Sequence, residues 1–269
     1  MLLGLPLAFS QVMIGTQRQP THPAPGRFEE LQLASEGLRL RAWLLRGDPQ
    51  RAAAVIVHGV GDSLESWTEV ADTLHRRGHT ALLLDLRGHG GSEGRQMTLG
   101  GREREDVRAA ISHLQQQGLA PQGLLLMGWS MGAVAVLRAA AERSDVRAVV
   151  AEAPFDTYRN SVAHHARLLY GLPRWVPLIP LSIAMAEWRA GFRADDVDAV
   201  AAARKIRAPL LAVADGADPR MPETVVRRVF DAHPGPKRFW LAPGVDHVGA
   251  ILLPDYWKTV TAFLAENGV

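Results

Sequence analysis

The sequence predicts a mostly parallel α/β sheet in one domain. Six short, continuous apolar runs have the composition of strands buried on both faces: AAAVIV, TALLL, GLLLM, RAVVA, PLLAV and KRFWL. Segments with apolar residues at helical spacing separate these runs, and strictly alternating strands and helices are typical of parallel sheets. With 269 residues, 47% of them apolar, the chain is long enough to bury one sizeable core.

The N-terminal residues differ from the rest of the chain. The first fifteen, MLLGLPLAFSQVMIG, are apolar but lack a positively charged start, and the run is too short for a membrane-spanning helix. Three interpretations stay open: a covering helix or disordered end, a weak contact with a membrane surface, and a remnant of a targeting segment. A polar, proline-rich linker follows, so we separate residues 1–26 from the domain.

The sheet is expected to begin with a hairpin. Residues 28–33 and 38–44 alternate between apolar and polar side chains around a short turn, which is typical of antiparallel strands at a sheet edge. Further along, residues 67–74 and 107–114 have apolar side chains at helical spacing, and a glycine follows each stretch. These stretches are predicted to be the helices between the buried strands.

The alternation of strand and helix breaks once, in residues 154–196. This stretch is rich in aromatic residues, and prolines interrupt what would otherwise be continuous helix. It reads as an insertion that either roofs a pocket for an apolar group or packs on its own domain, and it too could touch a membrane surface. We therefore expect a core of residues 27–153 and 197–269 with a small helical lid, residues 154–196, inserted into it.

One stretch, LLLMGWSMGAVAVLRAA, carries the most specific chemical signal. A buried strand runs into a helix within about one residue, and the turn between them holds Gly128, Ser130 and Gly132. Such a turn strains the serine backbone, and side chains at the two glycine positions would collide with neighbouring elements. The bend lifts the hydroxyl clear of the sheet, beside the N–H groups of the helix N-terminus. Ser130 is the candidate nucleophile.

The sequence resembles the α/β-hydrolase fold from about residue 28 to residue 264. Five stretches carry the resemblance, in the expected order: VIVHGVGDS (55–63), LLLDLRGHGGSEG (82–94), GWSMG (128–132), ADGADPRMP (214–222) and PGVDHVG (243–249). The resemblance implies eight strands, helices on both faces and a lid after the sixth strand. The most similar members are lidded esterases, lipase-like proteins and serine-aminopeptidase-like proteins.

A serine near neutral pH needs a base, and the base needs a group that fixes its tautomer. His247 follows KRFWL through a proline–glycine turn, which places it at the edge of the sheet where Ser130 emerges. His58 and His89 lie near the same edge, but each adjoins a glycine in a stretch better explained as a fixed loop. His247 is the candidate base.

Three carboxylates compete to be the third group. Asp218 follows the run PLLAV and precedes a helix that starts near Pro222, as in the family pattern. Asp215 lies three residues earlier, where that pattern usually has glycine. Glu152 directly follows the run RAVVA, and some members of the fold carry the acid there. We favour Asp218 and keep the other two open.

An oxyanion needs two backbone donors. One is predicted to be the N–H of Met131, immediately after the nucleophile, and family analogy assigns the other to Val60. Together these residues predict a serine hydrolase that cleaves esters or thioesters with an apolar group, through an acyl-enzyme. An aminopeptidase or amidase on the same triad, with a lid residue such as Glu187 fixing the ammonium, and a non-catalytic binding protein are the alternatives.

Composition sets the remaining expectations. The 30 basic and 28 acidic residues nearly balance, so no broad basic field exists to hold a nucleic acid. The chain has no cysteine, which excludes disulfides, thiolate catalysis and cysteine–zinc sites. The adjacent His164 and His165 point in different directions on a helix and make a poor metal site. We expect a small-molecule ester or amide substrate, no metal or organic cofactor, and a cytoplasmic location, with membrane association or export left open.

Overall fold

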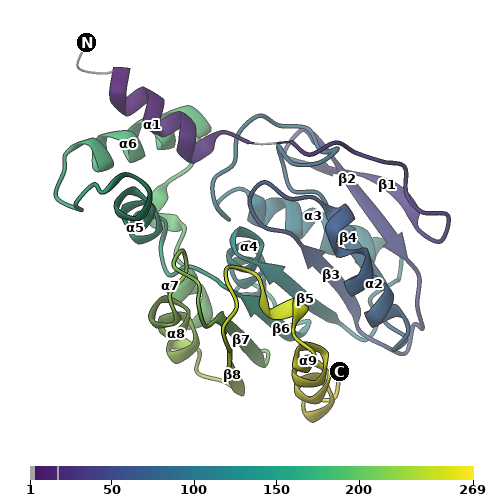
Figure 1. The fold of residues 1–269 in the computed structure, drawn as a ribbon. Coiled ribbons are helices and arrows are strands. Elements are labelled where there is room, and N and C mark those ends of the chain that lie inside the picture. The colour runs from purple at the N-terminus through teal and green to yellow at the C-terminus, as the bar shows by residue number, and fades with distance from the viewer. Residues whose placement is uncertain (1–3, 17) are drawn as a thin grey trace.

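The computed structural model describes residues 4–16 and 18–269 (Figure 1). Met1 to Leu3 of the apolar N-terminal run and Gln17 of the linker lie outside the described residues. The strands of the sheet are β1 (Glu29–Ser35), β2 (Leu38–Leu45), β3 (Ala53–Val57), β4 (Ala81–Leu84), β5 (Leu124–Trp129), β6 (Val146–Glu152), β7 (Leu210–Asp215) and β8 (Lys237–Ala242).

The eight strands form one sheet in the order β1-β2-β4-β3-β5-β6-β7-β8. The pairs β1–β2 and β2–β4 are antiparallel, and every pair from β4 to β8 is parallel. The predicted hairpin and the predicted parallel sheet are both confirmed. Since the parallel strands point the same way, the loops after β3, β5, β7 and β8 meet at one edge of the sheet.

Helices cover both faces of the sheet. They are α1 (Gly4–Ile14), α2 (Thr68–His75), α3 (Glu103–Gln116), α4 (Met131–Ala140), α5 (Tyr158–Tyr170), α6 (Leu178–Ala190), α7 (Ala199–Ala203), α8 (Glu223–Ala232) and α9 (Asp255–Glu266). One core packs α3, α4 and α7 against alternate strand residues, and a second core packs α2 and α9 against the others. The continuous apolar runs in the sequence follow from this burial on both sides.

Three helices gather at one end of the molecule. Figure 1 shows α1 beside α6, with α5 next to them, away from the edge strands β1 and β2. Ile14 packs with Ala186 and Ala190 of α6, and Arg189 donates to Ser10 Oγ at 2.8 Å. We call α1, α5 and α6 the cap helices. Of the three interpretations of the N-terminal run, the described residues from Gly4 onward form a covering helix. No helix in the described ranges is both long and apolar enough to cross a bilayer.

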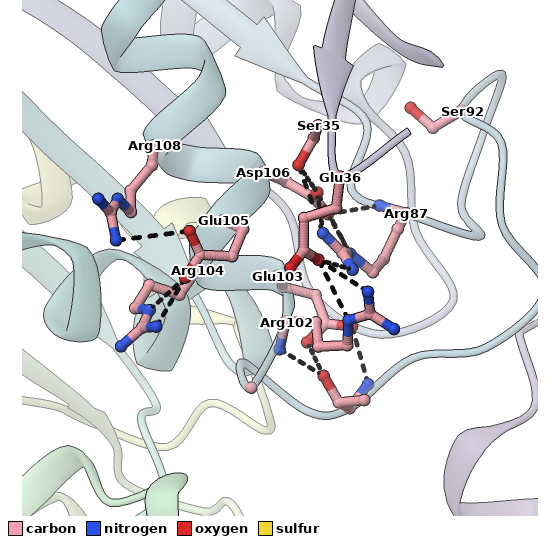
Figure 2. Close-up of polar contacts among 12 residues, drawn as sticks. Ser35, Glu36, Arg87, Ser92, Arg102, Glu103, Arg104, Glu105, Asp106 and Arg108 are labelled. Atoms are coloured by element: carbon pink, nitrogen blue, oxygen red, sulfur yellow. Dashed lines mark hydrogen bonds and ion pairs between the residues drawn. The ribbon is translucent and has the colours of Figure 1, made fainter. Parts of the chain in front are cut away.

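A buried ionic network anchors the loop after β4. Figure 2 shows Arg87 between Asp106 of α3 and Glu36 of the hairpin turn. The Arg87 guanidinium donates to Asp106 Oδ1 at 2.6 Å, and its backbone N–H donates to Asp106 Oδ2 at 2.9 Å. Ser35 Oγ donates to the same carboxylate at 2.8 Å. The charge of Arg87 is paired, and the carboxylate oxygens of Asp106 accept several hydrogen bonds. The network therefore fixes this loop without leaving a buried charge unsatisfied.

Candidate active site

The turn between β5 and α4 has the strained geometry that the sequence predicts. Ser130 has φ 52° and ψ −116°, a combination that is rare for a residue with a side chain. A Cβ at Gly128 would lie 2.5 Å from the carbonyl oxygen of Gly132, and one at Gly132 would lie 2.3 Å from that of Val57. Glycine is therefore required at both positions, so that β5, α4 and β3 can approach closely enough to present the serine.

His247 and Asp218 meet Ser130 in a continuous line of hydrogen bonds. His247 Nε2 lies 2.9 Å from Ser130 Oγ, and His247 Nδ1 lies 2.6 Å from Asp218 Oδ2. When the imidazole is neutral, Nδ1–H donates to the carboxylate and Nε2 accepts from the hydroxyl. The loops after β5, β7 and β8 thus bring together the three residues named from the sequence, in the arrangement that activates a serine hydroxyl.

Asp218 is held as a carboxylate. Its side chain is buried, and burial alone would raise its pKa, but the hydrogen bond and charge of His247 and the N–H groups of Met221 and Arg220 outweigh burial. These two N–H groups donate to Asp218 Oδ1 at 3.0 and 2.7 Å. The pKa of Asp218 therefore lies below its ordinary value, and the group is ionised when it faces the imidazole.

The two competing carboxylates have other partners. Asp215 accepts the backbone N–H groups of Val248 and Ala250, each at 2.9 Å, so it fixes the loop that carries His247. Glu152 is fully buried beside Asp215 and accepts from Trp129 Nε1 at 2.8 Å. Burial raises the pKa of Asp215 to about 6, and burial together with the charge of Asp215 raises that of Glu152 well above its ordinary value. Neither group accepts a hydrogen bond from His247.

The expected oxyanion donors adjoin the serine. Met131 is the first residue of α4, where a backbone N–H has no carbonyl four residues earlier in its own helix. The loop containing Val60 also lies against the nucleophile, since a Cβ on Gly59 would be 3.3 Å from Ser130 Cβ. Val60 and Met131 both line the cavity at the serine. The structure thus brings both predicted donors to one site.

Two other histidines considered as bases form part of the loop framework. His58 donates through Nδ1 to the carbonyl of Gly59 at 2.7 Å and accepts the N–H of Leu86 at Nε2 at 3.1 Å. His89 donates through Nδ1 to the carbonyl of Arg87 at 2.9 Å. Burial lowers the pKa of His58, and burial together with the neighbouring His58 lowers that of His89 to about 4. Both rings are therefore neutral near pH 7.

A cavity of about 610 Å³ opens at Ser130 and His247. Its lining is mostly apolar and comes from the strand-end loops and from two of the cap helices. The principal apolar side chains are Phe9, Val12, Met13, Trp67, Met97, Leu99, Met131, Phe155, Val162, Leu169, Tyr170 and Met221. This volume and lining suit a small organic substrate with an apolar group.

Sequence reasoning missed the part that α1 plays in this cavity. Phe9, Val12 and Met13 line its wall, and α1 is held there by the N–H of Met97, which donates to the carbonyl of Ile14 at 2.9 Å. An apolar run ahead of a polar linker indicates only that its side chains are expected to be buried. It gives no sign of where the helix docks, because the docking surface on α6 lies more than 160 residues downstream.

Asp215, Asp218 and His247 also have the residue types of a metal site. One potential ligand atom from each lies within 4.8 Å of the others. In each case that atom already serves another purpose, since Nδ1 of His247 faces Asp218 and both oxygens of Asp215 accept backbone N–H groups. Hydrogen bonding within the protein accounts for the cluster.

The sheet order, the strained serine turn and the strand-end loops define an α/β hydrolase. A family model described as serine aminopeptidase, S33, matches residues 48–188, and the chain belongs to this family of hydrolases. The uncharacterized protein YqkD of Bacillus subtilis is 31% identical over 215 residues, which cover 78% of this chain and 70% of that protein.

Two further comparisons extend the picture. The thiohydrolase aneE of Aspergillus aculeatus is 32% identical over 128 residues, covering 45% of this chain and 40% of that protein. The esterase Pf2001 of Pyrococcus furiosus superimposes with a TM-score of 0.72 at 22% identity, over 96% of this chain and 98% of that structure. Nearly the whole chain is thus similar in fold to a solved esterase.

Proposed function

We propose that this chain is a serine hydrolase that cleaves carboxylic esters or thioesters with an apolar acyl or alcohol group. The observation that carries the proposal is the unbroken line from Asp218 through His247 to Ser130, which ends in a mostly apolar cavity. A thiohydrolase among the relatives and an esterase among the similar structures support this substrate class.

In the proposed mechanism, Ser130 Oγ attacks the carbonyl carbon while His247 Nε2 takes its proton. Asp218 stabilises the imidazolium, and the N–H groups of Val60 and Met131 donate to the oxyanion. Collapse of the tetrahedral intermediate breaks the bond to the leaving oxygen or sulfur, which receives the proton from His247. Water then attacks the acyl-enzyme with His247 as base, releasing the acid and restoring Ser130.

The charges around the cavity favour esters over aminoacyl amides. An aminopeptidase has to hold the substrate ammonium, and Asp62 is the only acidic residue among the described residues that line the cavity. Its carboxylate already accepts from Ser66 Oγ at 2.6 Å and Trp67 Nε1 at 2.8 Å. Glu187, considered for this role, instead accepts the N–H of Ala194 at 2.8 Å and pairs with Arg159. The family's description nevertheless keeps an aminopeptidase as the second candidate.

Covalent labelling and substrate series test the proposal. A fluorophosphonate should label wild-type protein at Ser130 and leave Ser130→Ala unlabelled, whereas a binding protein of this fold would not react. Hydrolysis of p-nitrophenyl esters from acetate to decanoate, run beside aminoacyl p-nitroanilides, should show faster cleavage of medium-chain esters. Faster cleavage of an anilide than of every ester would replace esterase activity with the aminopeptidase alternative.

A further inference from the structure

A second cavity, of about 240 Å³, lies beside the active-site cavity. It is bounded by α5, by the loop that carries Asp218 and by the start of α8, which Figure 1 shows on the same side of the molecule. Four residues line both cavities: Phe155, Ser161, Arg220 and Met221. The two spaces are therefore separated by no more than one layer of side chains.

The smaller cavity is strongly basic. Four arginines line it: Arg167, Arg174, Arg220 and Arg228. Among its described lining residues, Asp156 alone carries a carboxylate, and Asp156 already accepts from Arg228 at 2.7 Å and from Asn160 Nδ2 at 2.9 Å. Four positive charges therefore face one negative charge.

Three of these guanidinium groups lack an ionic partner. Within the described residues, no carboxylate lies within 4.0 Å of Arg167, Arg174 or Arg220, and Arg174 donates only to the neutral amide oxygen of Asn160, at 2.8 Å. Elsewhere on the surface, many arginines are paired with acids. An arginine's planar array of donors fits the oxygens of a carboxylate or phosphate.

The basic cavity is joined structurally to the catalytic loop. The backbone N–H of Arg220 donates to Asp218, and Arg220, an exposed residue, lines both cavities. His164 of α5 donates through Nε2 to the carbonyl of Pro219 at 2.7 Å, which fixes the wall of the cavity to the loop that holds the triad acid. A ligand group held here would therefore lie at a fixed position relative to the triad.

We propose that the arginine-lined cavity binds an anionic group, a carboxylate or a phosphate, of the substrate whose ester is cleaved at Ser130. This inference rests on the proposed function and deepens it. The substrate would be an amphiphile with an apolar part in the larger cavity and an oxyanion at Arg167, Arg174 and Arg220. Such recognition should lower KM and change kcat little, because the anion stays remote from the atoms that react.

Matched substrates test this assignment. The first pair is the mono-p-nitrophenyl ester of suberic acid, which has a free carboxylate, and the neutral diester in which that carboxylate is methylated. The second pair carries the carboxylate, free or methylated, on the alcohol side. For at least one pair, wild-type protein should have a KM about tenfold lower for the anionic member. This preference should weaken as ionic strength rises, because salt screens exposed charges.

Variants separate the basic cavity from general surface charge. Arg167→Gln with Arg174→Gln should remove the preference for the anionic ester while leaving kcat and the KM of the neutral ester within about twofold of wild type. The matched control is Arg51→Gln, which changes an exposed arginine just before β3, at the end of the parallel strands away from the catalytic loops; this variant should keep the preference. Equal KM values for both members of each pair, or a preference that survives the double substitution, would overturn the inference.

Inorganic phosphate distinguishes a free anion from a substrate group. Phosphate should raise the Tm of wild-type protein but not of the double variant, and it should compete with the anionic ester. Stabilisation by phosphate without any preference for anionic esters would assign the cavity to free anions and reject a substrate role. If neutral esters are not cleaved and fluorophosphonate does not react, the proposed function fails. The effect of phosphate on Tm still reports whether the arginine-lined cavity binds an anion.

Discussion

The strand-end loops and the cap helices form opposite sides of one cavity, yet they are held by different kinds of contact. Directional hydrogen bonds fix the loops. Backbone N–H groups donate to the carboxylate oxygens of Asp218 and Asp215, and His247 is held between Asp218 and Ser130. Apolar packing dominates in the cap helices, where Ile14 meets α6 and Phe9 meets Tyr170 at a ring distance of 5.2 Å. A hydrogen bond depends on both the distance and the angle between donor and acceptor, whereas apolar packing is non-directional and depends mainly on the buried area.

The cap helices also keep apolar surface exposed. Trp175, before α6, is 80% exposed and Trp188 of α6 is 81% exposed, while the triad residues on the other side are largely buried. Under the proposed function, the loops carry the reacting groups and the cap helices line the space for the apolar group of the substrate. Substitutions on the two sides should therefore affect different kinetic quantities.

The largest effect is expected at the nucleophile. Ser130→Ala removes the attacking oxygen, and because triad members act as a unit, kcat should fall by about 10⁴-fold or more. The measurement is hydrolysis of the best ester in the chain-length series, with circular dichroism as the control for folding. Retention of most of the wild-type rate on every active substrate would place the chemistry elsewhere.

The next effect separates Asp218 from Asp215. Asp218→Asn leaves the imidazole without its charged partner, so kcat should fall by about 10³- to 10⁴-fold. Asp215→Asn leaves the triad contacts in place but weakens the support of the His247 loop and removes the charge beside Glu152, so it should lower kcat by about tenfold to a hundredfold and the free energy of unfolding by about 1 to 3 kcal/mol. Steady-state kinetics and urea unfolding measure both. The reverse order of losses in kcat would make Asp215 the triad acid.

A smaller, selective effect is expected in the cap helices. Phe9→Ala removes apolar area from the cavity wall, so kcat/KM for octanoate esters should fall about tenfold while that for acetate changes less than about twofold. Leu5→Ala is the matched control, because Leu5 is an exposed α1 residue that does not line the cavity. Equal losses on both chain lengths would mean that α1 supports the triad and does not select the acyl group.

The smallest effect concerns the buried carboxyl pair beneath the loops. The pKa of Asp215 is raised to about 6 and that of Glu152 lies well above its ordinary value, so the folded state binds these protons more tightly than the unfolded state. Their contribution to stability is present below about pH 4; that of Asp215 is lost as pH rises through about 6, and that of Glu152 is lost as pH rises through its own raised pKa. Glu152→Gln should flatten this decline by about 1 to 2 kcal/mol between pH 5 and pH 8 in urea unfolding. An unchanged pH profile would show that the pair does not titrate in this range.

Much of the catalytic side could be predicted because its signals are local. Glycine is required on either side of Ser130 because a side chain there would clash with nearby backbone. The strand before His247 shows that its loop lies at the carboxyl ends of the strands. The sequence favours Asp218 over Asp215 through its spacing to Pro222 and the family pattern, but the two carboxylates have the same chemistry and lie on one loop. That choice depends on a contact between loops 29 residues apart in the chain.

The sequence alone determined the parallel sheet, the serine turn and the order of Ser130, Asp218 and His247, because burial patterns and backbone sterics act over short stretches of chain. Folding in three dimensions decided which carboxylate meets His247, how α1 joins the cavity wall and which arginines gather beside it. Ser130 and His247 are 117 residues apart, and α1 docks on α6, more than 160 residues downstream. Such contacts join surfaces that no local pattern pairs, so they appear only when the packed elements are seen together.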